Sequence, residues 1–256
     1  MGKLIRMDLY RMPKSKAFMV CLILTFILAL AIAPLGKLMF NLANSLSSEI
    51  SEAYPAEVKL SEILSAPFPM INLMLVLLSM SFFFYADMEN GYIKNIAGQM
   101  PMKGFTVLSK YVAAVIHNLI FAAAGIIGHL IGVLLVQQIA VDGGVLDSIR
   151  VLALKLLLVQ SLSAILLLAV STFRSKSLGI VLAVLFGLGL TSLIYLGINE
   201  GLRPIFGEKT DISKIMPDSV MSEKPLKTMK ALAVAVVAGG AFLLPAVKIF
   251  DRKEVK

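Results

Sequence analysis

The stretch AFMVCLILTFILALAIAPLG, residues 17–36, carries no charged side chain at any of its twenty positions. About 20 apolar residues at a rise of 1.5 Å each cross a hydrocarbon core of roughly 30 Å. In lipid the backbone amides must be bonded within the segment, and a continuously apolar run achieves this as a helix, whereas a transmembrane strand alternates apolar and polar residues. The stretch therefore predicts a membrane-spanning helix near the N-terminus.

Five further stretches of the same kind follow along the chain. The charge-free windows are Ala17–Gly36, Ala66–Tyr85, Tyr111–Ala140, Leu156–Phe173, Ser177–Asn199 and Ala231–Val247. They predict spans at about 17–40, 66–86, 111–140, 151–173, 177–199 and 230–249. Because residues 111–140 exceed one untilted crossing, a tilted helix or an interfacial end is expected there. The predicted fold of residues 1–256 is thus a single all-α domain, a polytopic membrane protein with a six-helix bundle.

The charges predict which side of the membrane each loop faces. The chain has 24 Lys and Arg against 16 Asp and Glu, a net charge of +8. Basic residues near span ends are retained in the cytoplasm. With both termini inside, the inner segments hold 14 of the 24 basic residues and 5 of the 16 acidic ones. The excess charge therefore indicates topology and contact with anionic membrane lipid rather than with nucleic acid. A bacterial cytoplasmic membrane is the expected location.

The segments flanking the windows give three further expectations. Residues 1–16 place Ile5 and Leu9 at helical spacing while Arg6 and Arg11 project elsewhere, which predicts a basic helix in the inner interface; an irregular flank is the alternative. The first window is expected to be retained rather than cleaved as a signal peptide. Segments 41–65 and 200–229 are predicted extracellular loops, either ordered or mobile. The single cysteine, Cys21, excludes an internal disulfide and a Cys-based metal site.

Enzymatic chemistry has little support in the sequence. No His-Glu-x-x-His or Gly-x-Ser-x-Gly motif occurs. The two histidines, His117 and His129, lie twelve residues apart, about 120° around a helix. Polar residues inside the windows are expected to form hydrogen bonds between helices, with a proton or cargo contact as the alternative. These candidates are Asn72, His117, Asn118, His129 and Gln160.

An energy source must come from another polypeptide if the chain transports. A Gly-x-x-x-x-Gly-Lys-Ser/Thr phosphate loop is absent from the sequence. The chain itself is therefore expected to need no cofactor and to have no ATPase activity, and ATP and Mg²⁺ would be bound by a partner subunit. Such a partner needs a cytoplasmic contact, and the longest predicted inner loop is 87–110.

That loop contains a small amphipathic unit. Tyr92, Ile96 and Met100 lie at positions i, i+4 and i+8, and Gly98 and Pro101 end the unit. Two helical turns are not stable alone in water. The apolar side of the unit therefore needs a protein partner or the membrane surface, and a short interfacial helix is the simpler interpretation.

In the order of these features the chain resembles the six-span permease subunits of type-2 ATP-binding-cassette (ABC) exporters, such as the permeases that export lantibiotics or peptide toxins. In that family a basic interfacial helix precedes the first span, and a Glu-x-Gly after the second span leads into a coupling helix. A Pro and a Lys then open the third span. The matching elements here are Gly2–Met12, Glu89-Asn-Gly91, Tyr92–Gln99, Pro101 and Lys110, and Phe250-Asp251-Arg252-Lys253 is similar to the family's ending. Met102-Lys103-Gly104 departs from the commoner pattern, in which a small residue is followed by Arg.

The resemblance implies an ATP-driven exporter built from two permease copies, identical or not, and two ATPase subunits. It assigns contact with the ATPase to Glu89, Gly91, Tyr92, Ile93, Lys94, Asn95, Ile96 and Pro101. Glu89 would pair with a basic group at the inner end of the bundle or cap a helix. The expected cargo is hydrophobic or amphipathic, with a peptide or toxin first and a drug or lipid second. The alternatives are a membrane scaffold or sensor that transports nothing, or the membrane subunit of an energy-coupling importer.

Small residues on two windows predict close helix packing. They are Gly128 and Gly132 on the third window and Ala231, Ala235, Ala238 and Gly239 on the sixth. These faces can pack within one bundle or between two copies, and packing within the bundle is the expectation.

Overall fold

The computed structural model of the chain describes residues 1–46, 54–65, 68–89, 103–206, 211–223 and 225–252. Its elements are almost all helical, which confirms the all-α prediction. In chain order they are α1 (Gly2–Arg11), η1 (Met12–Lys14), α2 (Lys16–Leu46), β1 (Glu57–Lys59), α3 (Leu60–Ser65), α4 (Met70–Glu89), α6 (Gly104–Leu134), β2 (Gln138–Ala140), α7 (Val145–Phe173), α8 (Lys176–Gly187), α9 (Thr191–Phe206), η2 (Ile212–Ile215), α10 (Pro217–Ser222) and α11 (Thr228–Arg252).

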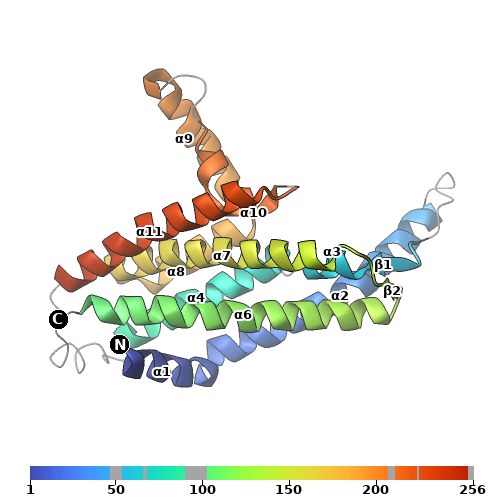
Figure 1. Ribbon diagram of the computed structural model, residues 1–256, viewed down its shortest axis with the longest axis horizontal. Helices are drawn as coiled ribbons and strands as arrows, with labels where there is room; N and C mark the ends of the chain where they lie inside the picture. Colours follow the sequence, from blue (N-terminus) through green and yellow to red (C-terminus); the bar gives the residue numbers. More distant parts are fainter. Residues whose placement is uncertain (47–53, 66–67, 90–102, 207–210, 224, 253–256) are drawn as a thin grey trace.

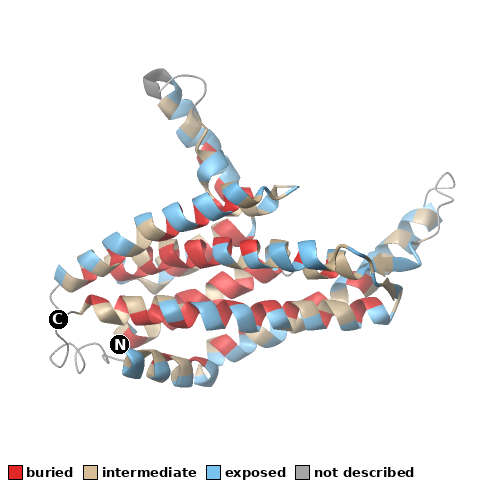
Figure 2. Ribbon diagram, in the orientation of Figure 1, coloured by how far each residue is buried: buried red, intermediate tan, exposed pale blue. Residues whose placement is uncertain are grey.

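Five of these helices are long and apolar enough to cross a membrane, so the chain is a multi-pass membrane protein. They are α2, α4, α6, α7 and α11. They run side by side along the long axis of the molecule, and the two termini lie at the same end (Figure 1). Buried residues gather on the faces that these helices turn toward one another, while much of their outer surface is exposed (Figure 2). Large apolar side chains such as Val237 and Leu244 of α11 are on that outer surface, as expected for contact with lipid.

The fifth predicted span is not one continuous helix. Residues 177–199 are divided between α8 and α9, which meet at a bend of 90°. The turn falls on Gly189, whose φ of 70° is disfavoured for residues with a side chain. A Cβ on Gly187 would come within 2.3 Å of the Met74 Cα, so α8 packs closely on α4 just before the turn. α9 then leaves the side of the bundle (Figure 1).

The bounds of the other spans also differ from the predicted ones. α6 begins seven residues before the window Tyr111–Ala140 and ends at Leu134. The last residues of that window form β2, which pairs in parallel with β1. The amide of Gln137 donates to the Pro55 carbonyl at 2.8 Å, so polar side chains join the outer segments where the hydropathy window predicted helix. α2 continues to Leu46 and α7 already begins at Val145, both beyond the bounds predicted for these spans.

The segments predicted to be extracellular, here called the outer segments, are partly ordered. Ser61, at the start of α3, donates its hydroxyl to Asp142 at 2.6 Å, which joins the first outer segment to the one before α7. In the second outer segment η2 and α10 form two short helices, and Val220 of α10 is fully buried against α7 and α11. Of the two interpretations left open for segment 200–229, the ordered one therefore holds for residues 212–222.

Both faces of small residues pack within the bundle. A Cβ on Gly132 would lie 2.2 Å from the Leu30 carbonyl oxygen, and one on Gly128 would lie 2.6 Å from that of Phe26. Helix α6 therefore approaches the backbone of α2 without side chains between them. On α11, Ala231 and Ala235 pack with residues of α7. Close approach of this kind gives dispersion contacts that do not depend on water.

Candidate functional site

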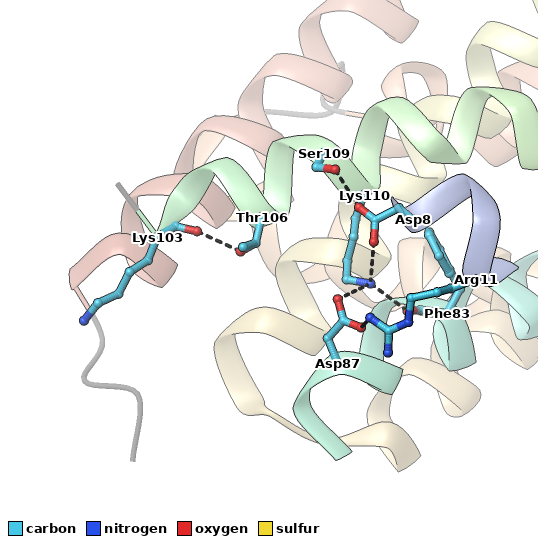
Figure 3. Close-up of polar contacts among 8 residues, drawn as sticks. All are labelled: Asp8, Arg11, Phe83, Asp87, Lys103, Thr106, Ser109 and Lys110. Carbon is cyan, nitrogen blue, oxygen red and sulfur yellow. Dashed lines mark hydrogen bonds and ion pairs between the residues drawn. The ribbon is translucent and has the colours of Figure 1, made fainter. Parts of the chain in front are cut away.

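Four charged side chains from three helices meet at the end of the bundle where the termini lie. Helix α1 supplies Asp8 and Arg11, α4 supplies Asp87, and α6 supplies Lys110 (Figure 3). We call these four residues the inner cluster, after the membrane side that the charges predict for this end. Asp8, Asp87 and Lys110 are only about one-twentieth exposed, at 4%, 5% and 5%. Within the described part of the chain, the only other fully buried acid or base is His117.

Lys110 is at the centre of the inner cluster. Its Nζ lies 2.9 Å from Asp87 Oδ2 and 3.8 Å from Asp8 Oδ1. It also donates to the Phe83 carbonyl at 3.1 Å and lies 4.4 Å from the centre of the Phe83 ring. Through one ammonium group, α6 is therefore bonded to both α1 and α4.

The remaining contacts complete the charge balance. Arg11 Nη1 lies 2.8 Å from Asp87 Oδ1, and its side chain is one-third exposed, at 33%. Ser109 donates its hydroxyl to Asp8 Oδ2 at 2.5 Å. Two carboxylates face two cations, so the inner cluster is formally neutral. Buried charges are tolerated when they are paired and hydrogen-bonded in this way, and losing one partner leaves the others uncompensated.

Local sequence explains why the cluster forms here. On α1, Asp8 lies three residues after Ile5 and four before Met12, so an acid shares the face that packs into the bundle. Met12 is 2% exposed and belongs to the main core, and Leu9 packs against that core. At the start of α6, a Cβ on Gly104 would meet Val247 at 2.7 Å, and its amide lies 3.4 Å from Asp251 Oδ1 of α11. The inner ends of α1, α4, α6 and α11 are thereby held together.

The predicted partner-contact residues fall into two groups. Gly91, Tyr92, Ile93, Lys94, Asn95, Ile96 and Pro101 lie outside the described residues. Glu89 ends α4, and its Oε1 lies 3.5 Å from Lys176 Nζ at the start of α8. This is a pairing with a basic group at the inner end, the arrangement expected from the sequence, although both side chains are exposed by a third or more. A screened pair of this kind contributes little to stability.

The residues predicted for the interfacial helix lie on α1, and they differ in exposure. Ile5 and Leu9 are half-buried, Arg6 is exposed, and Arg11 belongs to the inner cluster. Because Gly2–Arg11 is helical, the predicted helix is confirmed over the alternative of an irregular flank. The structure adds that α1 is bonded to the spans by charge, which the sequence interpretation had assigned to the membrane surface alone.

The polar candidates inside the windows mostly connect helices. His117 of α6 shares a hydrogen bond of 2.9 Å with Ser79 of α4 and stacks on Phe121. Asn118 donates to Gln160 of α7 at 2.9 Å, and Gln160 donates to the Tyr111 carbonyl at 2.8 Å. Asn72 is 1% exposed, while His129 is half-buried. His117, Asn118 and Gln160 therefore form the hydrogen bonds between helices that the sequence predicted.

Sequence reasoning missed the inner cluster as a unit. It assigned Lys110 only through the family pattern and used Asp8 and Asp87 only in the count of inner charges. The signal was present, because Asp8 is an acid on the apolar face of an otherwise basic helix. A lone acid there requires a buried cation. What the sequence could not show is which of the inner basic residues supplies it.

The inner cluster makes a prediction about pH. Burial raises the pKa of Asp8 above its ordinary value of 3.8, and this outweighs the opposing effects of Lys110 and of the Ser109 hydrogen bond. The folded chain therefore binds the Asp8 proton more tightly than the unfolded chain does. The contribution of Asp8 to the unfolding free energy is therefore fully present below pH 3.8 and is lost as the pH rises through the raised pKa. In a pH series of detergent unfolding, the unfolding free energy of wild type minus that of Asp8→Asn is expected to fall with rising pH across this window.

Asp142→Asn is the matched control. The Ser61 hydroxyl bond is the foremost cause that lowers the pKa of Asp142. The contribution of Asp142 to the unfolding free energy is present above pH 3.8 and is lost as the pH falls through the lowered pKa. The difference between wild type and Asp142→Asn is therefore expected to rise with pH. If the two differences changed with pH in the same direction, the raised pKa assigned to Asp8 would be contradicted.

Among the residues that the structure describes, no group of three or more His, Cys, Asp and Glu side chains is placed to hold a metal ion. Neither a protein-family model nor a curated protein matches the chain.

Proposed function

We propose that the chain is the permease subunit of an ABC exporter, which moves a hydrophobic or amphipathic substrate outward while a separate subunit hydrolyses ATP. The observation that carries this proposal is the inner cluster. Residues 90–102, which hold the proposed coupling unit, connect the end of α4 to the start of α6. The inner cluster bonds these two helices to each other and to α1. A force applied to residues 90–102 would therefore act on the bundle through helices that are already joined.

The path of that force can be followed through close contacts. From Lys110 and Asp87 it enters α6 and α4. At Gly128 and Gly132 the backbone of α6 lies directly against the backbone of α2. Movement of α6 would therefore displace α2. The Gly104 contact with Val247 brings α11 into the same unit. Closure of the ATPase would in this way rearrange four helices together, and well-packed elements of this kind switch between discrete arrangements rather than deform continuously.

The proposed cargo follows from the scarcity of charge in the bundle interior. The acids and bases buried in the described helices are Asp8, Asp87 and Lys110 of the inner cluster and His117, and each contacts another residue of the chain. This supports an apolar or amphipathic cargo, for which we propose a hydrophobic peptide. Two permease copies and two ATPase subunits, with ATP and Mg²⁺ bound to the latter, form the proposed transporter. The bent pair α8–α9, whose exposed apolar residues extend beyond the bundle, is compatible with a second copy beside the first.

ATP hydrolysis by the purified assembly tests the proposal. The tagged chain, purified from its native membrane in mild detergent and placed in nanodiscs, is expected to carry an ATPase whose activity vanadate inhibits. Ile93→Asp combined with Ile96→Asp places two charges on the proposed docking unit and should remove at least nine-tenths of that activity. The matched control is Val141→Asp with Leu146→Asp, which adds the same charges at outer residues that are each 79% exposed.

Two outcomes would reject the proposal. If wild type carries no ATPase, the chain is not a transporter subunit of this class, and the scaffold or sensor function takes its place. If an ATPase is retained in full by the Ile93/Ile96 variant, the partner binds elsewhere. The latter result is the one expected of an energy-coupling importer.

A further inference from the structure

A cavity of about 520 Å³ lies near the start of α4, whereas Asp87 of the inner cluster lies near the end of that helix. It is open on one side and is lined by the bend between α8 and α9, the short helix α10, the residues around the start of α4 and one residue of α7. In Figure 1 this is the region where α9 departs from the bundle beside α10. Its volume is in the range of sites for small ligands, roughly 300–1,000 Å³.

The wall of this cavity has two chemically different parts. Phe68, Leu73 and Phe186 form an apolar part, and each is less than one-tenth exposed. Hydroxyl and carboxylate groups form the other part, namely those of Thr191, Ser192, Asp218, Ser219, Ser222 and Glu223. A few convergent polar groups beside an apolar wall are the usual composition of a binding site for an amphiphile.

Asp218 is the polar group best placed to recognise a ligand. Its Oδ2 accepts a hydrogen bond from the Thr191 hydroxyl, and its Oδ1 accepts one from the Tyr195 hydroxyl at 2.9 Å. A carboxylate has about four acceptor positions, so these two bonds fix the group without saturating it. The two other charged residues of the wall have partners of their own, since Glu223 pairs with Lys230 and Lys155 donates to the Ser65 carbonyl at 2.6 Å.

The surroundings indicate an amphiphile that arrives from the membrane. Leu188 and Leu190, on either side of the turn at Gly189, are each 41% exposed and adjoin the cavity residues Gly187 and Thr191. They provide an apolar surface outside the cavity along which an acyl chain can lie. The cavity itself is large enough for a polar head group but not for a folded peptide.

We propose that this cavity binds the head group of a lipid that bears an ammonium group. The ammonium would donate to Asp218, and the glycerol region and upper chains would contact Phe68 and Phe186. An ammonium on a carboxylate gives a charge-assisted hydrogen bond, which is stronger than a neutral one. This site goes beyond the proposed function, because it is independent of any ATPase and shares no residue with the inner cluster.

Three short probes separate the parts of this proposal. Purified chain in an uncharged maltoside is titrated with dihexanoyl-phosphatidylethanolamine, with dihexanoyl-phosphatidylglycerol, which lacks the ammonium, and with phosphoethanolamine, which lacks the chains. Binding is read by calorimetry. Wild type is expected to bind the ethanolamine lipid at least tenfold more tightly than either other probe. Equal binding of the two lipids would overturn the role of the ammonium, and equal binding of phosphoethanolamine would assign the cavity to a soluble amine instead.

Two variants and a control locate the binding. Asp218→Asn keeps an oxygen for Thr191 or Tyr195 and should remove the preference between the two lipids. Ser222→Trp fills the cavity from its exposed rim without changing Asp218. It should weaken binding of the ethanolamine lipid at least tenfold. Asp147→Asn, whose side chain is 86% exposed at the start of α7, should leave binding as in wild type. Unchanged binding in the Ser222 variant would place the lipid elsewhere and overturn the proposal, even if the Asp218 variant does not fold.

Discussion

Replacing Lys110 by methionine is expected to lower the free energy of unfolding by about 3–5 kcal/mol. The methionine fills a similar volume but leaves Asp8 and Asp87 buried against each other, with Arg11 as the one remaining cation of the inner cluster. It also removes the donor to the Phe83 carbonyl. The measurement is unfolding of the purified protein with increasing mole fraction of dodecyl sulfate in mixed micelles.

Lys103→Met is the matched control for this experiment. Lys103 lies just before the same helix, and its ammonium points away from the inner cluster (Figure 3). The control is expected to change the unfolding free energy by less than about 0.5 kcal/mol, as surface substitutions usually do. A second variant, Lys110→Met with Asp8→Asn, restores neutrality with the Arg11–Asp87 pair and should recover part of the loss. A loss below about 1 kcal/mol for Lys110→Met would show that the cluster does not join the three helices.

Gly132→Ala is expected to destabilise the bundle by about 1–3 kcal/mol, the usual cost of overpacking. The added methyl would lie 2.2 Å from the Leu30 carbonyl oxygen, which belongs to the backbone of α2, so the two helices must move apart. Gly197→Ala makes the same chemical change on α9, where no atom lies within 4 Å of the new Cβ. There the variant should be neutral or more stable by up to about 1 kcal/mol, because alanine favours a helix over glycine. The same unfolding assay compares them, and equal effects would contradict the packing of α6 on α2.

The all-α membrane fold could be predicted from the sequence because hydropathy over some twenty residues is a strong signal. Lipid permits few backbone structures, so windows such as Ala17–Gly36 leave little choice. Helix ends were harder to place, because hydropathy does not respond to tertiary bonds. Residues 138–140 are apolar enough to extend a helix, yet they pair with β1. Helix α8 ends where Gly187 packs against Met74, a contact that no local pattern reveals.

The candidate site was predicted in pieces rather than as a unit. The helical spacing of Ile5 and Leu9 correctly predicted a helix before the first span. It did not show that Asp8 on the same face would meet Lys110, because that contact joins residues 102 positions apart in the sequence. Charge counting treats inner residues as solvated, whereas three of the four residues in the inner cluster are almost fully buried. Polar residues such as Asn118 and Gln160 were correctly expected to bond between helices, since an unpaired amide in the membrane is costly.

The central claim is that residues 90–102 contact an ATPase, and site-specific photocrosslinking tests it most directly. A benzoylphenylalanine placed at Ile93, activated in intact native membranes, is expected to capture a protein that carries a Gly-x-x-x-x-Gly-Lys-Ser/Thr phosphate loop. The same group at Val141, 79% exposed in an outer segment, should capture no such protein. Mass spectrometry of the crosslinked band identifies the partner. Absence of a phosphate-loop protein from the Ile93 band, or its equal capture from Val141, would contradict the account.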